Sequence, residues 1–212
     1  MEHGRRRGPG LTVHIAIMVE GATERAFAPH LRAFLRQRLS DKMPRLDFRP
    51  QDGRIPKGDL LRRTVRTLLK NTDAVIALTD VYTGGRPRDF ADAGDAKRKM
   101  RSWVGDEPRF HPHAAQHDFE AWLLPYWTEI AKIAGSNKAA PSPNPETVNH
   151  DRPPATVLAE IFRTGSAKRR YLKTRDALAI LSDQDLSVSA EKCPELKAFL
   201  NTILTLSGGE LL

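Results

Sequence analysis

Residues 12–24 read TVHIAIMVEGATE, and they combine the two patterns on which the rest of the chain is built. Residues 12–19 are rich in β-branched side chains and almost wholly apolar, which is typical of a strand covered on both faces of a sheet. Glu20 and Gly21 end the apolar run, and Thr23 is a suitable N-cap for a helix. The stretch therefore predicts a buried strand that leads directly into a helix.

The chain up to residue 134 repeats this alternation. Strands are expected at 46–49, 74–79 and 110–116, and helices at 23–39, 59–71 and 95–104. Pro29 lies inside the first helical pattern, so it is expected to kink that helix or to mark its true start. Alternating strands and helices favour an α/β domain with a mostly parallel sheet and helices on its faces.

Composition divides the sequence into four segments. These are a disordered basic tail at 1–11, the α/β domain at 12–134, a Pro-rich connection at 135–154, and a helical C-terminal subdomain at 155–212. Short helical patterns in the last segment cover 155–162, 175–181 and 195–206. We expect this subdomain to pack on the same domain.

The overall composition limits the classes of protein to consider. No stretch reaches the apolar length that spans a bilayer, so no membrane association is expected. The tail lacks the apolar centre of a secretory signal, and the single Cys193 cannot form an internal disulfide, so we expect a cytoplasmic location. The net charge of +8 favours an anionic partner such as nucleic acid. No Walker-type glycine loop supports P-loop nucleotide hydrolysis.

Acidic residues follow three of the predicted strands. Glu20 follows the first strand, Asp80 follows the third, and Asp118 and Glu120 follow the fourth. Because the carboxyl ends of parallel strands form one edge of a sheet, these side chains should project into one crevice. Carboxylates from separate elements are the ligands that Mg²⁺ or Mn²⁺ prefers, and such a cation polarises a phosphodiester. Simpler roles stay open: a helix-dipole contact for Glu20 and Glu24, a turn or cap for Asp80, and an exposed helix position for Glu120.

Three histidines precede or adjoin the last acidic pair. His111, His113 and His117 have the spacing of one strand face, as in a zinc site. No cysteine joins them, so zinc is less favoured than Mg²⁺ or Mn²⁺. His117 is adjacent to Asp118 and is an alternative candidate for orienting a carboxylate or shuttling a proton.

The order of these motifs resembles a TOPRIM-like family of bacterial proteins. The motifs are VEGATE at 19–24, Asp80-Val81-Tyr82, Asp89-Phe90 and HDFEAW at 117–122, followed by NPETVNHDRPPA at 144–155, AKRRYLK at 167–173 and CPEL at 193–196. TOPRIM is the metal-dependent domain shared by topoisomerases, primases and overcoming-lysogenization-defect nucleases. The resemblance spans nearly the whole chain from residue 13 and implies a TOPRIM-like α/β fold.

The resemblance also implies roles for the acidic residues. Glu20 looks like the first TOPRIM glutamate, which binds metal or acts as a general base, and Glu24 matches a supporting acidic position in the nucleases. Asp118 and Glu120 resemble the final acidic pair. The implied catalytic residues are Glu20, Glu24, Asp80 and Glu120, and the implied metal ligands are Glu20, Asp80, Asp118 and Glu120.

Tyr82 departs from the family pattern. Asp80 matches the first aspartate of the Asp-x-Asp motif, but Tyr82 occupies the position of the second. A replacement ligand would have to come from Asp89, Asp92 or elsewhere. One-metal catalysis and a site that binds a ligand without catalysis therefore both stay open. Tyr82 itself is expected to lie beside the metal ligands.

Basic residues form two clusters, and a solvated helix face explains each without a ligand. The residues expected to bind nucleic acid are Arg86, Arg88, Lys97, Arg98, Lys99 and Arg101. The second cluster comprises Lys168, Arg169, Arg170, Lys173 and Arg175. Arg86 and Arg88, in the loop after Asp80, could neutralise charge in a transition state.

Two functions follow from these expectations. The first is a nuclease, or related phosphoryl-transfer enzyme, that needs Mg²⁺ or Mn²⁺ and acts on DNA or RNA, for example as a phage-defence effector. The alternative is a non-catalytic TOPRIM-like subunit that regulates an ATPase partner. By resemblance, such small proteins are often encoded beside an ATPase.

Overall fold

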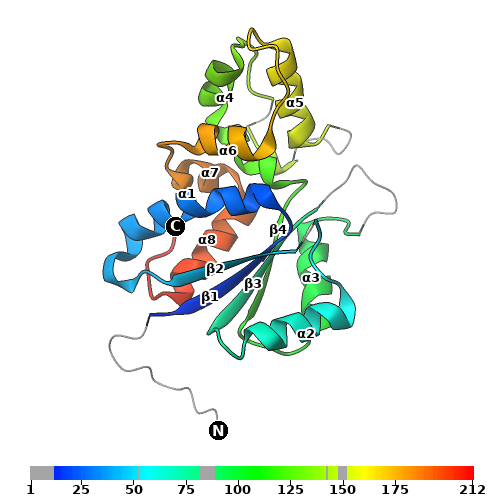
Figure 1. Ribbon diagram of the computed structural model, residues 1–212, viewed down its shortest axis with the longest axis vertical. Helices are drawn as coiled ribbons and strands as arrows, with labels where there is room; N and C mark the ends of the chain where they lie inside the picture. Colours follow the sequence, from blue (N-terminus) through cyan, green and yellow to red (C-terminus); the bar gives the residue numbers. More distant parts are fainter. Residues whose placement is uncertain (1–11, 52, 82–88, 142, 148–151) are drawn as a thin grey trace.

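A four-stranded parallel sheet forms the centre of the computed structural model (Figure 1). The structure describes residues 12–51, 53–81, 89–141, 143–147 and 152–212, and for 22–26 it describes the backbone alone. The strands are β1 (His14–Val19), β2 (Arg45–Pro50), β3 (Ala74–Asp80) and β4 (Phe110–Ala115), in the order β2-β1-β3-β4. Each neighbouring pair is parallel. The predicted α/β class and parallel sheet are confirmed.

Helices cover both faces of the sheet (Figure 1). On one face, α1 (Ala22–Leu39) and α8 (Pro194–Leu206) pack against the side chains of Ile15, Ile17 and Ile76. On the other face, α2 (Gly58–Leu68) and α3 (Ala93–Val104) pack against the alternate strand residues, such as Ala16 and Val75. Successive strand residues point to opposite faces, and both faces are buried, which explains the continuous apolar runs in the strands.

The remaining helices extend the molecule beyond the carboxyl end of the sheet (Figure 1). They are α4 (Trp127–Ala134), α5 (Pro154–Thr164), α6 (Lys173–Leu181) and α7 (Leu186–Lys192). Short 3-10 turns lie at Ser40–Lys42, Phe119–Trp122, Leu124–Tyr126 and Pro145–Thr147. Side chains of α5, α6, α7 and α8 belong to the same hydrophobic cluster as the α1 face of the sheet. The predicted boundaries at residues 134 and 154 stay predictions.

The observed elements differ from the predicted ones in a few places. The first helix begins at Ala22, so Pro29 lies inside it and does not mark its start. The second helix ends at Leu68, earlier than expected. Neither α4 nor α7 was predicted. The tail at 1–11 lies outside the described residues. No helix in the described part of the chain is long and apolar enough to cross a membrane.

Candidate acidic site at the edge of the sheet

Glu20 stands at the carboxyl end of β1, beside Thr79 of β3. Val19 pairs with Leu78 in the parallel register, so Glu20, the residue after β1, comes next to Thr79 of β3. The hydroxyl of Thr79, a buried side chain, donates a hydrogen bond to Oε1 of Glu20. Glu20 is therefore fixed at the predicted edge by a neighbouring strand.

Asp118 and Glu120 lie just beyond β4 and are almost fully buried, at 3% and 1% exposure. The chain turns after β4 at His117, whose φ of 74° lies in the left-handed region. Asp118 then has an extended backbone and occupies the N-cap position of the 3-10 turn that contains Glu120. Phe119 anchors this turn in the core, with its ring centroid 5.4 Å from that of Phe27. Glu120 is thus not the exposed helix residue that the simpler interpretation expected.

Lys173 supplies a positive charge to this acidic group. It is the first residue of α6, and its Nζ lies 3.0 Å from Oε1 of Glu120. Burial lowers the pKa of this ammonium group, but the carboxylates of Glu120, Asp118 and Asp80 outweigh burial and raise the pKa above its ordinary value. Charged groups from β3, the turn after β4 and α6 therefore interact at one place.

One oxygen of Asp118 has no hydrogen-bond partner among the described residues. Oδ2 accepts a hydrogen bond of 3.3 Å from the backbone N–H of Ala155, at the start of α5. Oδ1 is buried and has no hydrogen-bond partner in the described part of the chain. Burial, together with the nearby charge of Glu120, raises the pKa of Asp118 to about 7. Near neutral pH this oxygen can take either a proton or a cation.

A divalent cation at this edge would have to be held by few protein ligands. Within the described ranges, no three His, Cys, Asp or Glu side chains form a group that could hold a metal ion. Mg²⁺ in phosphate-processing sites is commonly held by one or two carboxylates, with water and substrate phosphate completing its coordination. Oδ1 of Asp118, which has no hydrogen-bond partner among the described residues and lies near Glu120, is a candidate for one such ligand. The predicted set of four metal ligands stays a prediction.

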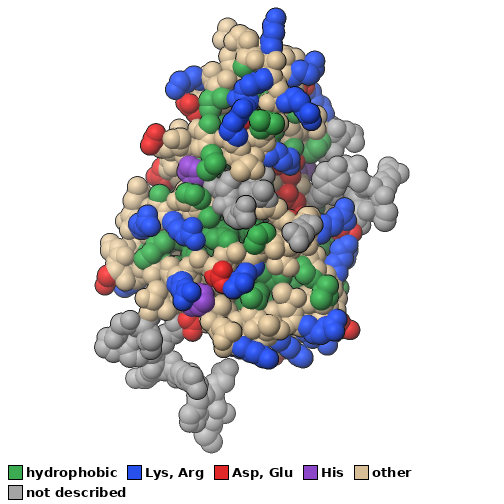
Figure 2. All heavy atoms as spheres, in the orientation of Figure 1, with side chains coloured by type: hydrophobic (Ala, Val, Ile, Leu, Met, Phe, Trp, Pro, Cys, Tyr) green, Lys and Arg blue, Asp and Glu red, His purple; other side chains and the backbone are tan. Residues whose placement is uncertain are grey.

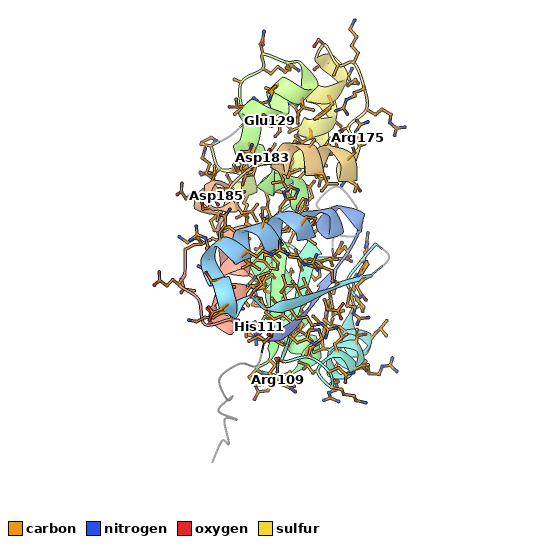
Figure 3. All side chains as sticks on the ribbon, turned by 60° about the vertical axis from the view of Figure 1, so that its left-hand side comes forward. Arg109, His111, Glu129, Arg175, Asp183 and Asp185 are labelled. Carbon is orange, nitrogen blue, oxygen red and sulfur yellow. The ribbon has the colours of Figure 1, made fainter. Side chains whose placement is uncertain are left out.

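The histidines of β4 do not join this group. Nε2 of His113 lies 3.0 Å from Oγ1 of Thr202 on α8, and the ring packs edge-on against Phe199. Burial lowers the pKa of His113 to about 3, so its ring is neutral at physiological pH. His111 lies at the end of the sheet away from α6, which carries Arg175 (Figure 3). His117 is buried, and its predicted role beside the carboxylates stays a prediction.

Some predicted site residues fall outside the described part of the chain. These are Tyr82, Arg86 and Arg88. Glu24 lies in the first turn of α1, but its side chain is likewise outside the description. Their predicted roles stay predictions.

Three of the four predicted basic residues on α3 are engaged in ion pairs. Nζ of Lys97 lies 2.6 Å from Oε2 of Glu195 in the first turn of α8. This ion pair joins α3 and α8, which lie on opposite faces of the sheet. Arg98 and Lys99 pair with Asp95 of their own helix at 3.6 and 2.8 Å. Arg101 is exposed. Nucleic-acid binding by this cluster stays a prediction.

Two residues near the acidic group were missed as site candidates from the sequence. Lys173 and Tyr171 both lie in the AKRRYLK segment, which the charge pattern identified only as basic. The Tyr171 hydroxyl is buried and lacks a hydrogen-bond partner among the described residues. Burial, then the charges of Glu120, Asp176 and Asp118, raise its pKa far above the ordinary value. Neither residue follows a strand, so no strand-end pattern could identify them.

The NPET and CPEL motifs have a structural role next to the site. The carboxylate of Glu146 accepts a 3.0 Å hydrogen bond from Nε1 of Trp122 and another of 3.0 Å from the backbone N–H of Glu195. Ser189 of α7 donates a 2.7 Å hydrogen bond to the carbonyl oxygen of Trp122. These bonds connect the turn that carries Glu120 to two helices of the C-terminal region.

Comparison with known proteins identifies a family and a fold. A family model described as "Domain of unknown function (DUF4276)" matches residues 19–204, so the chain belongs to this family. The C-terminal region of the Burkholderia pseudomallei OLD protein is similar in structure, with a TM-score of 0.53 and 15% identity over 91% of this chain and 98% of that one. The C-terminal region of the Xanthomonas campestris pv. campestris OLD protein has a TM-score of 0.48 and 16% identity, over 92% of this chain and 94% of that one. No curated protein matches the sequence.

The similarity to the Burkholderia OLD region concerns the fold alone. The parallel sheet flanked by helices is shared over nearly the full length of both chains. The predicted α/β architecture is therefore confirmed as one that resembles the fold of this OLD region. Membership in the TOPRIM group stays a prediction.

Proposed function

We propose that this chain is a nuclease, or a related phosphoryl-transfer enzyme, that depends on Mg²⁺ or Mn²⁺ and acts at the acidic edge beside Lys173. The observation that carries the proposal is the burial of Asp118 and Glu120 around one ammonium group, with Asp80 close enough to act on the same charge. Buried carboxylates destabilise a fold unless they are paired, so such a group is a candidate for function. The OLD-like fold and the sequence resemblance support the same function.

In this proposal Asp118 and Asp80 would hold the cation. When bound, it would polarise the phosphodiester and make a coordinated water more acidic. Lys173 stays charged at neutral pH because of its carboxylate neighbours, so it can neutralise negative charge on the phosphate oxygens. Glu120 positions that ammonium group through their 3.0 Å contact.

Glu20 is the proposed proton acceptor. Its carboxylate is oriented by the hydroxyl of Thr79 at the same edge of the sheet. As water attacks phosphorus, its proton passes to Glu20, the bond between phosphorus and the leaving oxygen breaks, and that oxygen takes a proton from solvent. The products are a phosphomonoester and a free hydroxyl group.

A cleavage assay with a matched pair of variants tests this proposal. The full chain is incubated with plasmid, single-stranded DNA and transfer RNA, with Mg²⁺, Mn²⁺ or a chelator. We expect metal-dependent cleavage of at least one substrate. Glu120→Gln should lower the rate about 100-fold or more, because the charge that positions Lys173 is lost. Glu129→Gln, which removes a partly exposed carboxylate paired with Lys132 on α4, should leave the rate unchanged.

The proposal fails if no substrate is cleaved and calorimetry detects no binding of either cation. It also fails if both variants cleave at the wild-type rate. Circular dichroism of Glu120→Gln serves as the control for folding.

The alternative function is a non-catalytic subunit that regulates an ATPase partner in phage defence. It is favoured by the same finding that no three candidate metal ligands are grouped in the described chain. Expression of wild type and Glu20→Ala, with and without the neighbouring gene product, separates the two functions. A nuclease effector should lose its toxicity with this change, whereas a regulatory scaffold should tolerate it.

A further inference from the structure

A groove lined by basic residues lies between α5 and the segment that enters α6. Its volume is about 580 Å³, and its lining includes Arg163, Lys168, Arg169, Arg170, Tyr171 and one acidic residue, Glu160. Figure 2 shows that Lys and Arg side chains gather on this end of the molecule. The groove belongs to the region that the sequence identified only as a solvated basic cluster.

The positive charge of the groove is largely uncompensated. Lys168 and Arg170 are exposed, and neither forms a salt bridge in the part of the chain that the structure describes. Glu160 is neutralised from outside the groove by Lys138, at 3.0 Å, and by Arg152. The wall therefore attracts anions along its length.

Arg169 is a fixed part of this wall. Its guanidinium lies 2.8 Å from the buried carboxylate of Asp176 and 4.4 Å from the ring centroid of Phe162. An arginine held by both a carboxylate and an aromatic ring loses little conformational freedom when a ligand approaches. It gives the groove a preformed side.

The loop that carries these cations is held in one conformation by the end of α4. The backbone N–H groups of Ser166 and Ala167 donate to the carbonyl oxygens of Gly135 and Ala134, at 2.8 and 3.2 Å. Lys168 has a φ of 41°, in the left-handed region that residues other than glycine rarely adopt. Such backbone strain persists where surrounding contacts fix the chain, and it is concentrated at ligand sites.

The groove also adjoins the acidic site. Tyr171 lines the groove, and its buried hydroxyl interacts with the charges of Glu120 and Asp118. Lys173, at the end of the same segment, contacts Glu120. Residues 168–173 thus connect the basic wall with the carboxylates.

We propose that this groove binds the phosphate backbone of a nucleic-acid strand and directs it to the acidic edge. The inference rests on the proposed function for the identity of the polyanion. Lys and Arg contacts to successive phosphates supply most of the affinity of such surfaces and give it a strong dependence on salt. Two exposed cations of the groove have no carboxylate partner among the described residues, whereas three of the four basic residues on α3, Lys97, Arg98 and Lys99, are paired. It therefore takes the role that the sequence assigned to the α3 cluster.

A binding experiment in the absence of metal tests the groove without requiring cleavage. Fluorescence anisotropy of the full chain is measured with labelled single-stranded and duplex DNA, and with RNA, of about 20 nucleotides, from about 50 to 200 mM salt. The double variant Lys168→Gln/Arg170→Gln should weaken binding about 10-fold or more. It should also reduce the slope of log K against log salt by about 1.4 to 1.8, because two phosphate contacts are lost.

The matched control is Arg66→Gln/Lys70→Gln, which removes the same charge from two exposed positions in and just after α2. It should keep the wild-type affinity and slope. Equal losses in both double variants would show a general charge effect and overturn the inference. A loss in Arg98→Gln/Arg101→Gln with none in the groove variant would also overturn it, as would binding to anionic phospholipid vesicles without binding to nucleic acid.

The two proposals fail in different ways. Groove-dependent binding without cleavage under any metal condition overturns the nuclease alone. Metal-dependent cleavage with unchanged binding by the groove variant overturns the groove alone. Thermal melting of each variant confirms that the fold is intact.

Discussion

The hydroxyl of Tyr171 is buried near the carboxylates of Glu120, Asp176 and Asp118 and has no hydrogen-bond partner in the described structure. A buried polar group without a partner destabilises a fold by about 1–3 kcal/mol. Tyr171→Phe should therefore raise the free energy of unfolding by about 1 kcal/mol, as measured by urea denaturation. A residue retained at such a cost is a candidate for substrate contact.

Tyr126 provides the matched control for this change. Its hydroxyl donates a 2.9 Å hydrogen bond to the carbonyl oxygen of Asp185, so Tyr126→Phe should lower the free energy of unfolding by about 1 kcal/mol. Equal destabilisation by both changes would mean that Tyr171 has a structural hydrogen bond and would contradict the assignment.

His113 makes folding depend on pH. Its pKa is about 3 in the folded chain, against an ordinary 6.5 when unfolded, so the unfolded state binds more protons between these values. Its contribution to stability is present above about pH 6.5 and is lost as the pH falls towards 3. His113→Phe should flatten the dependence of the free energy of unfolding on pH between about 4 and 7. Its carbon chemical shifts in the wild type should not titrate between about pH 5 and 8, and a midpoint there would contradict this account.

At the scale of single residues, the strand-end pattern in the sequence pointed to the carboxylates but not to the ammonium group of Lys173. Asp80, Asp118 and Glu120 were identifiable because each lies at or just after the end of a strand, and parallel strands end at a common edge. Lys173 and Tyr171 reach the same place from an irregular segment before a helix. Their position depends on how α5 and α6 pack, which no local pattern encodes.

Among the elements, the 3-10 turn after β4 depends most on distant contacts. Glu146 bonds the indole of Trp122 and the backbone of Glu195, and burial raises its pKa despite these donors. Glu146→Ala leaves the buried indole N–H and the partly buried backbone N–H without this acceptor, so it should lower the free energy of unfolding by about 3 kcal/mol. Denaturation in urea measures the change.

Glu129→Ala is the control for this element. Its carboxylate pairs with Lys132 at 3.3 Å on the surface of α4, and such pairs contribute less than about 1 kcal/mol. If Glu146→Ala were no more destabilising than Glu129→Ala, the proposed connection between the turn and the C-terminal helices would be wrong.

The main helices and strands were predictable where their patterns are long. The apolar runs of β1 and β3 and the periodic helix α1 follow from their own residues. Helices α4 and α7 contain 8 and 7 residues, too few for a clear helical period. Pro29 is tolerated inside α1 because packing of the helix against the sheet outweighs one missing backbone hydrogen bond.

For the molecule as a whole, the alternation of strands and helices predicted the α/β class but not how the C-terminal helices pack against the sheet. Side chains of α5 to α8 join the hydrophobic cluster on the α1 face, and this packing brings Lys173 to the end of the sheet. The site therefore draws on both halves of the sequence. A parallel sheet alone would provide only the carboxylates.

The most direct test of the acidic site is a crystal structure of the full chain soaked in Mn²⁺, with anomalous scattering used to locate the ion. We predict a Mn²⁺ peak at the carboxyl edge of the sheet, bound by the carboxylates of Asp118 and Asp80, with Lys173 still in contact with Glu120. The same soak of Asp118→Asn should show no peak there. A wild-type structure without Mn²⁺ at this edge, or with the ion only at a distant position such as His111, would contradict the account.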